Sequence, residues 1–177
     1  EKDIFPTKID REVLNFKTGE KYVMLGTKAM FFDKNDIKKI VEISSGENNR
    51  EMLFKDRLEG RPYTENDAKG FINYINEGWQ NNSNFVFVIR KENHEIVGFI
   101  EVINSNLDDS EVGYQADGGN GGFMTNALVE IEKISKDAGF KKLHAYVRTD
   151  NQKSEAVLLR AGFKKLNEQK IKYEKVL

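Results

Sequence analysis

Four glycines occur within residues 117–122, and they are the first feature of the sequence whose residue type and spacing could do chemistry. The residues before them, 111–116, have the composition of a strand, and an amphipathic stretch that begins near Met124 follows directly. A glycine-rich turn between a strand and a helix exposes backbone N–H groups, and the helix N-terminus adds a partial positive charge. The segment therefore suits a phosphate or pyrophosphate, although a tight connection without a ligand would have the same composition.

Two common phosphate-binding motifs fit this segment poorly. A P-loop requires Lys and then Ser or Thr after its last glycine, whereas Gly122 is followed by Phe123, Met124 and Thr125. A dinucleotide-binding fold would use Asp150, past the next expected strand, to bind a ribose. Yet Met124 occupies the place of its third glycine, and too little chain follows Asp150 for the remaining parallel strands. Neither an NTPase nor a dinucleotide-binding enzyme is favoured.

The overall composition narrows the class of protein. The 177 residues carry a formal net charge of −1, so no global field favours nucleic acid or anionic lipid, and no apolar run approaches the roughly 18 residues of a membrane span. Cysteine is absent and only His94 and His144 could supply imidazole. We therefore expect no metal, no nucleic acid and no membrane partner. The lack of cysteine and of a basic-then-apolar leader favours a cytoplasmic protein.

The elements that must position the glycines follow from hydrophobic periodicity. The first 20 residues are polar and aperiodic, and we treat them as an extension of unassigned structure. Thr64 and Asp67 resemble a capping box before a helix, and two runs rich in Val, Ile and Phe predict a hairpin. One crossover unit follows, so the sheet of this α/β domain should be mixed rather than wholly parallel. The expected strands are 22–28, 85–91, 96–103, 111–116, 141–147, 163–166 and 171–176, and the expected helices are 33–44, 50–58, 64–79, 123–138 and 154–161.

Several short motifs together are similar to a known family. Glu111-Val-Gly-Tyr114, the run from Gly119 to Ala127, Asp150-Asn-Gln-Lys-Ser154 and Gly162-Phe163 resemble the acetyl-CoA half of the GNAT superfamily of N-acetyltransferases, and its RimJ/RimL-like branch in particular. The resemblance covers about residues 85–163, with weaker similarity at 61–67 and 77–79. It implies one GNAT domain over residues 1–177, with a mixed, mostly antiparallel sheet flanked by helices. The substrate-side half would span about 22–84 and the acetyl-CoA-binding half about 85–177.

The resemblance implies acetyl-CoA as the cosubstrate and indicates which residues hold it. In the family, the glycine loop and the following helix bind the CoA pyrophosphate; the matching residues are Gly119, Asn120, Gly121, Gly122, Phe123 and Met124. The pantetheine arm pairs with the preceding strand, here Tyr114, Gln115 and Ala116, and a backbone N–H near Gln115 would stabilise the oxyanion. Asn151 and Ser154 complete the implied cofactor contacts.

Two departures from the family pattern Gln/Arg-x-x-Gly-x-Gly/Ala are visible. Gly119 stands where Gln or Arg is usual, whereas Met124, in the place of the second glycine, is common in this branch. The stretch from Tyr114 to Gly122 is also shorter than the pattern. The alternative function is therefore a non-catalytic GNAT-like module that binds CoA or regulates a partner.

Glu111 and Ser154 are the implied catalytic residues. An ammonium must lose a proton before it attacks a thioester, and Glu111 matches the position of the general base in several family members. Ser154 matches a serine that protonates the leaving thiolate in the RimJ/RimL-like branch, while Leu158 stands where many relatives have a tyrosine. A strand-end acid and a helix-capping hydroxyl are the structural alternatives. Because cysteine is absent, and no serine has a convincing His-Asp pair, we expect direct transfer in a ternary complex.

The acceptor is expected to be a primary amine, either a protein N-terminus or a small molecule. Asp108, Asp109 and Glu111 could attract a cationic amine, although a solvated acidic loop is the simpler interpretation. His144 is interpreted as a structural histidine in a strand and His94 as a turn residue. The oligomeric state is left open, with a homodimer as one option.

Overall fold

Eight strands form one sheet within the residues that the computed structural model describes, 2–119, 121–167 and 170–177. They lie in the order β1-β2-β3-β4-β5-β6-β8-β7, and neighbouring strands are antiparallel except for β5 and β6, which are parallel. The predicted mixed, mostly antiparallel sheet is confirmed. The bounds are β1 (Lys8–Leu14), β2 (Lys21–Thr27), β3 (Phe85–Arg90), β4 (Ile96–Val102), β5 (Ser110–Ala116), β6 (Lys142–Tyr146), β7 (Lys164–Asn167) and β8 (Lys170–Val176).

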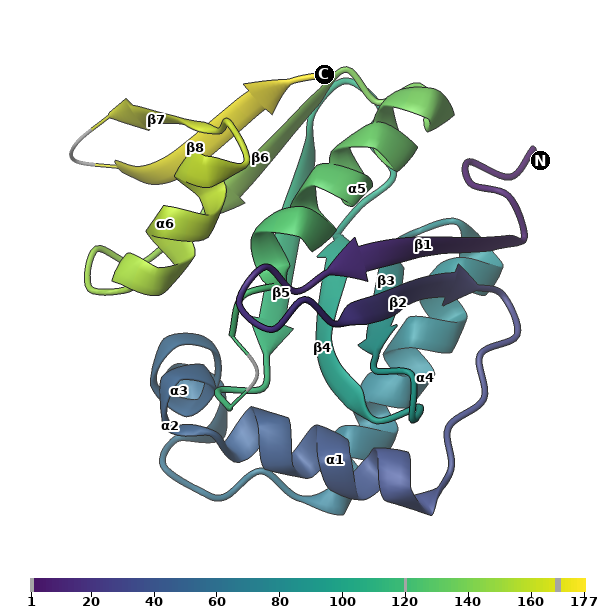
Figure 1. Ribbon diagram of the computed structural model, residues 1–177, viewed down its shortest axis with the longest axis vertical. Coiled ribbons are helices and arrows are strands. Elements are labelled where there is room, and N and C mark those ends of the chain that lie inside the picture. The colour runs from purple at the N-terminus through teal and green to yellow at the C-terminus, as the bar shows by residue number, and fades with distance from the viewer. Residues whose placement is uncertain (1, 120, 168–169) are drawn as a thin grey trace.

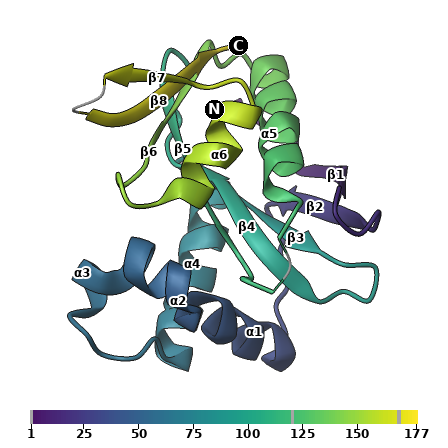
Figure 2. The ribbon, with the colours of Figure 1, turned by 60° about the vertical axis from the view of Figure 1, so that its left-hand side comes forward.

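Helices cover both faces of this sheet (Figure 1 and Figure 2). The helices are α1 (Lys34–Ser45), α2 (Glu47–Asn49), the π-helical turn η1 (Arg50–Phe54), α3 (Lys55–Leu58), α4 (Glu65–Asn81), α5 (Met124–Ala138) and α6 (Gln152–Arg160). Helices α1 and α4 pack together on the face that we call the α4 face, and α5 lies on the opposite, α5 face with α6 beside it. Each described helix is too short or too polar to span a bilayer.

The N-terminal segment is part of the sheet, which corrects the expectation of an extension without assigned structure. Strand β1 pairs antiparallel with β2 from Lys8 opposite Thr27 onward. Its apolar residues Ile9 and Val13 are buried, and Phe5 before it is buried among aromatic rings of the core. Only two apolar side chains point inward along β1, so the alternation is too sparse to identify a strand without its partner.

The strongly periodic helix α4 begins where the sequence predicts. Thr64 and Asp67 form a complete capping box, and Ala68, Ile75 and Trp79 are buried along one stripe. The indole Nε1 of Trp79 donates a 2.8 Å hydrogen bond to the backbone oxygen of Val86 in β3. A buried indole needs such a partner, and this bond joins the end of α4 to the start of the hairpin.

The predicted helix over 50–58 is helical but irregular, because α2, η1 and α3 follow one another with a π-helical turn between them. Asn49 lies at the start of this segment and is buried. Its side-chain Nδ2 donates to the backbone oxygens of Ile43 and Ala116, both at 2.8 Å. The segment is thereby tied to the end of β5.

Strands β5 and β6 separate after a short parallel contact. They pair only at Ser110 with Leu143 and at Glu111 with His144. Beyond that point β5 continues to pair with β4 as far as Ala116, while β6 pairs with β8. Figure 1 shows the two strands diverging. Within the described residues, one edge of the last part of β5 is therefore free of a neighbouring strand.

Candidate active site

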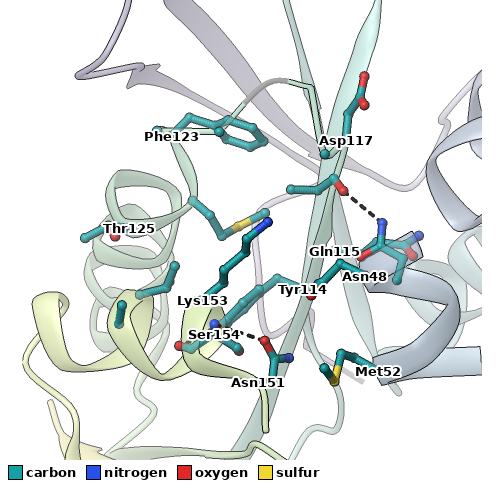
Figure 3. Close-up of a pocket in the computed structure, with 18 of the residues that line it drawn as sticks. Asn48, Met52, Tyr114, Gln115, Asp117, Phe123, Thr125, Asn151, Lys153 and Ser154 are labelled. Carbon is teal, nitrogen blue, oxygen red and sulfur yellow. Dashed lines mark hydrogen bonds between the residues drawn. The ribbon is translucent and has the colours of Figure 1, made fainter. Parts of the chain in front are cut away.

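A cavity of about 770 Å³ fills the gap between β5 and β6. It is lined by the C-terminal part of β5, the end of β6, one side of α6, the glycine loop, and residues 46–49 and 52–53. Figure 3 shows Tyr114 and Gln115 on β5, with Ser154 on α6 and Met52 on η1 around the same space. A volume of this size suits a ligand as large as a typical cofactor.

Most of the predicted cofactor-binding residues line this cavity. They are Tyr114, Gln115, Ala116, Gly119, Gly121, Gly122, Phe123, Met124, Asn151 and Ser154. Asn120 lies outside the described residues. Glu111, the predicted base, does not line the cavity. It lies two residues before Gly113, which does line it. Segments separated by nearly forty residues in the sequence are thus brought together around one space.

The glycine loop meets the N-terminus of α5 at this cavity. Gly122 has a φ of +107°, a conformation that residues with side chains rarely adopt. No side chain of the described residues caps α5, and its first residues, Met124 and Thr125, line the cavity. The first N–H groups of a helix have no partner within the helix, so they are available to an anion here.

The turn at residues 15–18, between β1 and β2, forms another part of the wall. Asn15 Nδ2 donates to the backbone oxygen of Gly121 at 3.2 Å, and the N–H of Phe16 donates to that of Gly122 at 3.0 Å. Sequence reasoning missed this turn because the contact joins residues more than a hundred positions apart. Lys17, two residues after Asn15 in an aperiodic segment, carried no motif signal.

Tyr114 and Ser154 share a hydrogen bond of 2.6 Å between their hydroxyl groups. The Tyr114 hydroxyl also lies 3.0 Å from the backbone oxygen of Ser154. Burial raises the pKa of Tyr114 to about 12, so the phenol keeps its proton at neutral pH. Asn151 caps α6, because its Oδ1 accepts from the Ser154 N–H at 3.2 Å. Asn151 therefore has the capping role considered for it, and Asn151 and Ser154 also line the cavity.

The backbone of β5 presents hydrogen-bonding groups to the gap. The Ile103 N–H donates to the Glu111 oxygen and the Asp117 N–H donates to the Val97 oxygen, both at 2.8 Å. In an antiparallel ladder the residues between such pairs point their N–H and C=O groups the other way. The N–H groups of Tyr114 and Ala116, on either side of Gln115, therefore face the gap.

Two carboxylates lie together on the α4 face beside this gap. Glu101 in β4 is opposite Gly113, and Glu111 is on the same face of β5. Tyr74 from α4 donates a 3.0 Å hydrogen bond to Glu101. Burial, and then the negative charge of Glu111, raise the pKa of Glu101 to about 7. A Cβ on Gly113 would lie 3.7 Å from Glu101 Oε1, so the carboxylate is next to the cavity wall.

Sequence reasoning did not find Glu101. The residue is the one charged side chain in a strongly apolar run, Ile96–Val102, and that is the signal that could have found it. Its importance depends on Tyr74 and Glu111, which come from other elements and meet it only in the folded chain.

The acidic loop before β5 is occupied by local ion pairs. Asp108 pairs with Lys141 at 2.6 Å, and Asp109 pairs with Lys142 at 3.0 Å. Asp109 also contacts His144 Nδ1 at 2.6 Å, and these neighbours lower the pKa of the Asp109 carboxyl. This supports the interpretation of Asp108 and Asp109 as a solvated loop and of His144 as a structural residue. No cluster of three or more candidate metal ligands occurs in the described parts of the chain.

Solved structures share this fold. RimJ of Mycobacterium smegmatis, in complex with CoA-disulfide, has a TM-score of 0.75 at 14% identity, covering 99% of this chain and 90% of that one. The microcin C7 self-immunity acetyltransferase MccE, in complex with acetyl-CoA and AMP, has a TM-score of 0.68 at 18% identity, covering 90% of this chain and 94% of that one. RimL, a ribosomal L7/L12 alpha-N-protein acetyltransferase, in complex with coenzyme A, has a TM-score of 0.69 at 13% identity, covering 94% of this chain and 98% of that one. At these identities the likeness establishes the fold alone.

The match to a family model identifies the class of protein as an acetyltransferase. Residues 31–164, most of the chain, match the acetyltransferase (GNAT) domain family, so this chain belongs to that family. The predicted family and enzyme class are confirmed. No curated protein matches the sequence.

Proposed function

We propose that this protein is a single catalytic domain that transfers the acetyl group of acetyl-CoA to a primary amine. One observation carries the proposal: the cavity between β5 and β6 extends from the glycine loop at the N-terminus of α5 to Gly113, which lies beside the carboxylates of Glu101 and Glu111 on the α4 face. The acetyl-CoA or CoA bound to MccE, RimJ and RimL supports this cosubstrate. The proposal retains a cytoplasmic location, since the absence of cysteine suits a reducing compartment.

The α5 face holds acetyl-CoA. The glycine loop and the N-terminus of α5 bind the pyrophosphate through backbone N–H groups. Arg148, Lys153 and Arg160 line the same cavity and supply positive charge for the phosphates. The free edge of β5 pairs with the amide groups of the pantetheine arm, as an added strand would. This arrangement directs the thioester toward the Tyr114 N–H.

The acceptor amine approaches from the α4 face. Glu111 accepts the proton that the ammonium loses, and Glu101 lies beside it with its pKa raised to about 7. The nitrogen then attacks the thioester carbonyl, so that a C–N bond forms and the C–S bond breaks. The backbone N–H of Tyr114 stabilises the charge on the carbonyl oxygen. The hydroxyl pair of Tyr114 and Ser154 donates a proton to the leaving thiolate and regains one from the second proton that the nitrogen loses as the amide forms.

The acceptor class is a peptide N-terminus or a small-molecule amine. RimL is named as an alpha-N-protein acetyltransferase, which supports the first class, and MccE binds AMP together with acetyl-CoA, which supports the second. A screen of N-terminal peptides, polyamines and amino acids, read by thiol release and by the mass of the product, identifies the acceptor. One class should give acetylated product well above the uncatalysed rate.

Thermal unfolding with acetyl-CoA tests the cosubstrate. The melting temperature should rise, because a ligand that binds only the folded state stabilises it by mass action. The matched variant is Gly119→Asp, which adds a negative charge to the loop where a Cβ meets nothing closer than Asp117 Oδ1 at 3.8 Å. Gly122 is unsuitable, since a Cβ there would lie 2.6 Å from Asn15 Oδ1 at a positive φ. Absence of a shift for the unmodified protein at millimolar acetyl-CoA would exclude it as cosubstrate. A shift without any acetylated product would favour the non-catalytic CoA-binding module.

A further inference from the structure

The glycine loop lacks a positively charged side chain of its own. Residues 117–125 contain no lysine or arginine, and they include the acid Asp117. A pyrophosphate diester carries two negative charges at neutral pH, and backbone N–H groups with a helix dipole offer only partial positive charge. The charge compensation for a pyrophosphate at this loop must therefore come from another part of the fold.

Lys17, in the turn between β1 and β2, lies directly against the loop. A Cβ added to Gly121 would be 3.5 Å from Lys17 Nζ, and a Cβ added to Gly122 would be 2.8 Å from Lys17 Cγ and 3.1 Å from Cδ. The aliphatic part of the lysine thus crosses Gly122 and its ammonium reaches Gly121. Lys17 is exposed and lines the cavity. None of the ion pairs between described residues involves it.

Asn15 holds the turn in place. This buried side chain accepts from the N–H groups of Lys17 at 3.0 Å and Thr18 at 3.3 Å through Oδ1. Its Nδ2 donates to the Tyr22 hydroxyl at 3.0 Å and to the backbone oxygen of Gly121 at 3.2 Å. One amide therefore fixes the backbone of Lys17 and the backbone of the loop relative to each other. Such a preformed arrangement lowers the entropic cost of placing the ammonium over a ligand.

We propose that Lys17 binds the pyrophosphate of acetyl-CoA, supplying from the β1–β2 turn the positive charge that the glycine loop lacks. The inference rests on the proposed function, since it assumes that acetyl-CoA occupies the cavity. It gives the N-terminal strand pair a role in cosubstrate binding. The basic residues Arg148, Lys153 and Arg160 belong to the segment from the end of β6 through α6. They are not part of the turn that contacts Gly121 and Gly122, so the positive charge at that contact comes from Lys17.

Isothermal titration with three ligands tests this role: acetyl-CoA, its 3′-dephospho form and S-acetyl-pantetheine, which has no phosphate. Lys17→Met should weaken both pyrophosphate-containing ligands by about 10- to 100-fold, the size expected for a charged hydrogen bond, and leave S-acetyl-pantetheine unchanged. Lys17→Arg should keep most of the affinity because it keeps the charge. The matched control is Lys21→Met, which removes an exposed lysine of β2 that pairs with Glu12 at 3.6 Å outside the cavity.

The outcomes separate this inference from the proposed function. If the unmodified protein binds acetyl-CoA and Lys17→Met binds it equally well, Lys17 has no role while the cosubstrate stands. A loss that disappears with the 3′-dephospho ligand would place Lys17 at the 3′-phosphate and overturn the pyrophosphate contact. If the unmodified protein does not bind acetyl-CoA, both ideas fall. Circular dichroism of each variant checks folding, which an exposed lysine should not affect.

Discussion

The hydroxyl of Tyr74 donates a 3.0 Å hydrogen bond to the carboxylate of Glu101, joining α4 to β4 at the edge of the cavity. The bond favours the charged carboxylate, but burial and the charge of Glu111 outweigh it and raise the pKa of Glu101 from 4.5 to about 7. The phenol in turn has its pKa raised by burial and by the two carboxylates, so it stays protonated and keeps donating.

This pKa gives a pH dependence of stability with a definite sign. The folded state holds the Glu101 proton more tightly than the unfolded state does, so the contribution of Glu101 to stability is greatest below pH 4.5 and is lost as the pH rises to about 7. Glu101→Gln removes this loss. The variant should gain about 1–3 kcal/mol relative to the unmodified protein between pH 4.5 and pH 8.

Thermal and urea unfolding across that range measure the difference. The control is Glu92→Gln, which makes the same substitution at an exposed acid in the turn of the β3–β4 hairpin. A stability difference for Glu101→Gln that stays constant from pH 4.5 to pH 8 would contradict the raised pKa.

The base assignment gives a second prediction. Glu111→Gln should keep acetyl-CoA affinity and lower kcat/KM by about 10²–10⁴-fold near neutral pH, where the amine is mostly an ammonium. Raising the pH should restore part of the rate, because free amine then forms without help. Glu101→Gln is the comparison, since it alters the neighbouring carboxylate on the same face. A larger loss in Glu101→Gln than in Glu111→Gln would move the base to Glu101.

Local sequence was enough to predict the parts of the site that short segments determine. The strand, glycine loop and α5 follow one another within thirty residues, and the caps Thr64 and Asn151 sit next to the turns they stabilise. Local hydrogen bonds and hydrophobic periodicity are readable from such segments.

The remaining parts depend on contacts that are distant in sequence. Strand β1 is stabilised by its pairing with β2. Lys17 lies against the glycine loop because Asn15 hydrogen-bonds to Gly121, 106 residues away. Glu101 is distinguished by Tyr74, 27 residues before it. Composition and periodicity do not encode such neighbours, so they predict no element for the N-terminal segment.

Close packing around Gly26 gives a third prediction. A Cβ there would lie 2.3 Å from the Trp79 ring and 2.6 Å from the Phe87 ring, both buried. Gly26→Ala should therefore destabilise the protein by about 1–3 kcal/mol through overpacking. Gly70→Ala, at an exposed position inside α4 with nothing within 4 Å, should stabilise it by about 0.5–1 kcal/mol. Urea unfolding compares the two, and equal effects would show that the Gly26 contact is not tight.

The hydroxyl pair of Tyr114 and Ser154 carries the last prediction. If this pair protonates the leaving thiolate, Tyr114→Phe and Ser154→Ala should each lower kcat, and the double variant should lose little more than either single one, because the hydroxyls act as one unit. The Tyr114 phenol has a pKa of about 12 and stays protonated below pH 10, so its ionisation should not lower kcat in that range. A thioester with a more acidic thiol should diminish the loss, since its thiolate needs less help.

Tyr173→Phe is the matched control, because the Tyr173 hydroxyl also binds α6, through Glu155, but lies outside the cavity lining. Both phenol deletions should loosen α6 to a similar extent, which thermal unfolding reports. Only Tyr114→Phe should reduce kcat under saturating acetyl-CoA. If the two variants lose stability equally and both keep kcat, the Tyr114 hydroxyl positions α6 and the thiolate leaves without an acid, as a fairly stable leaving group can.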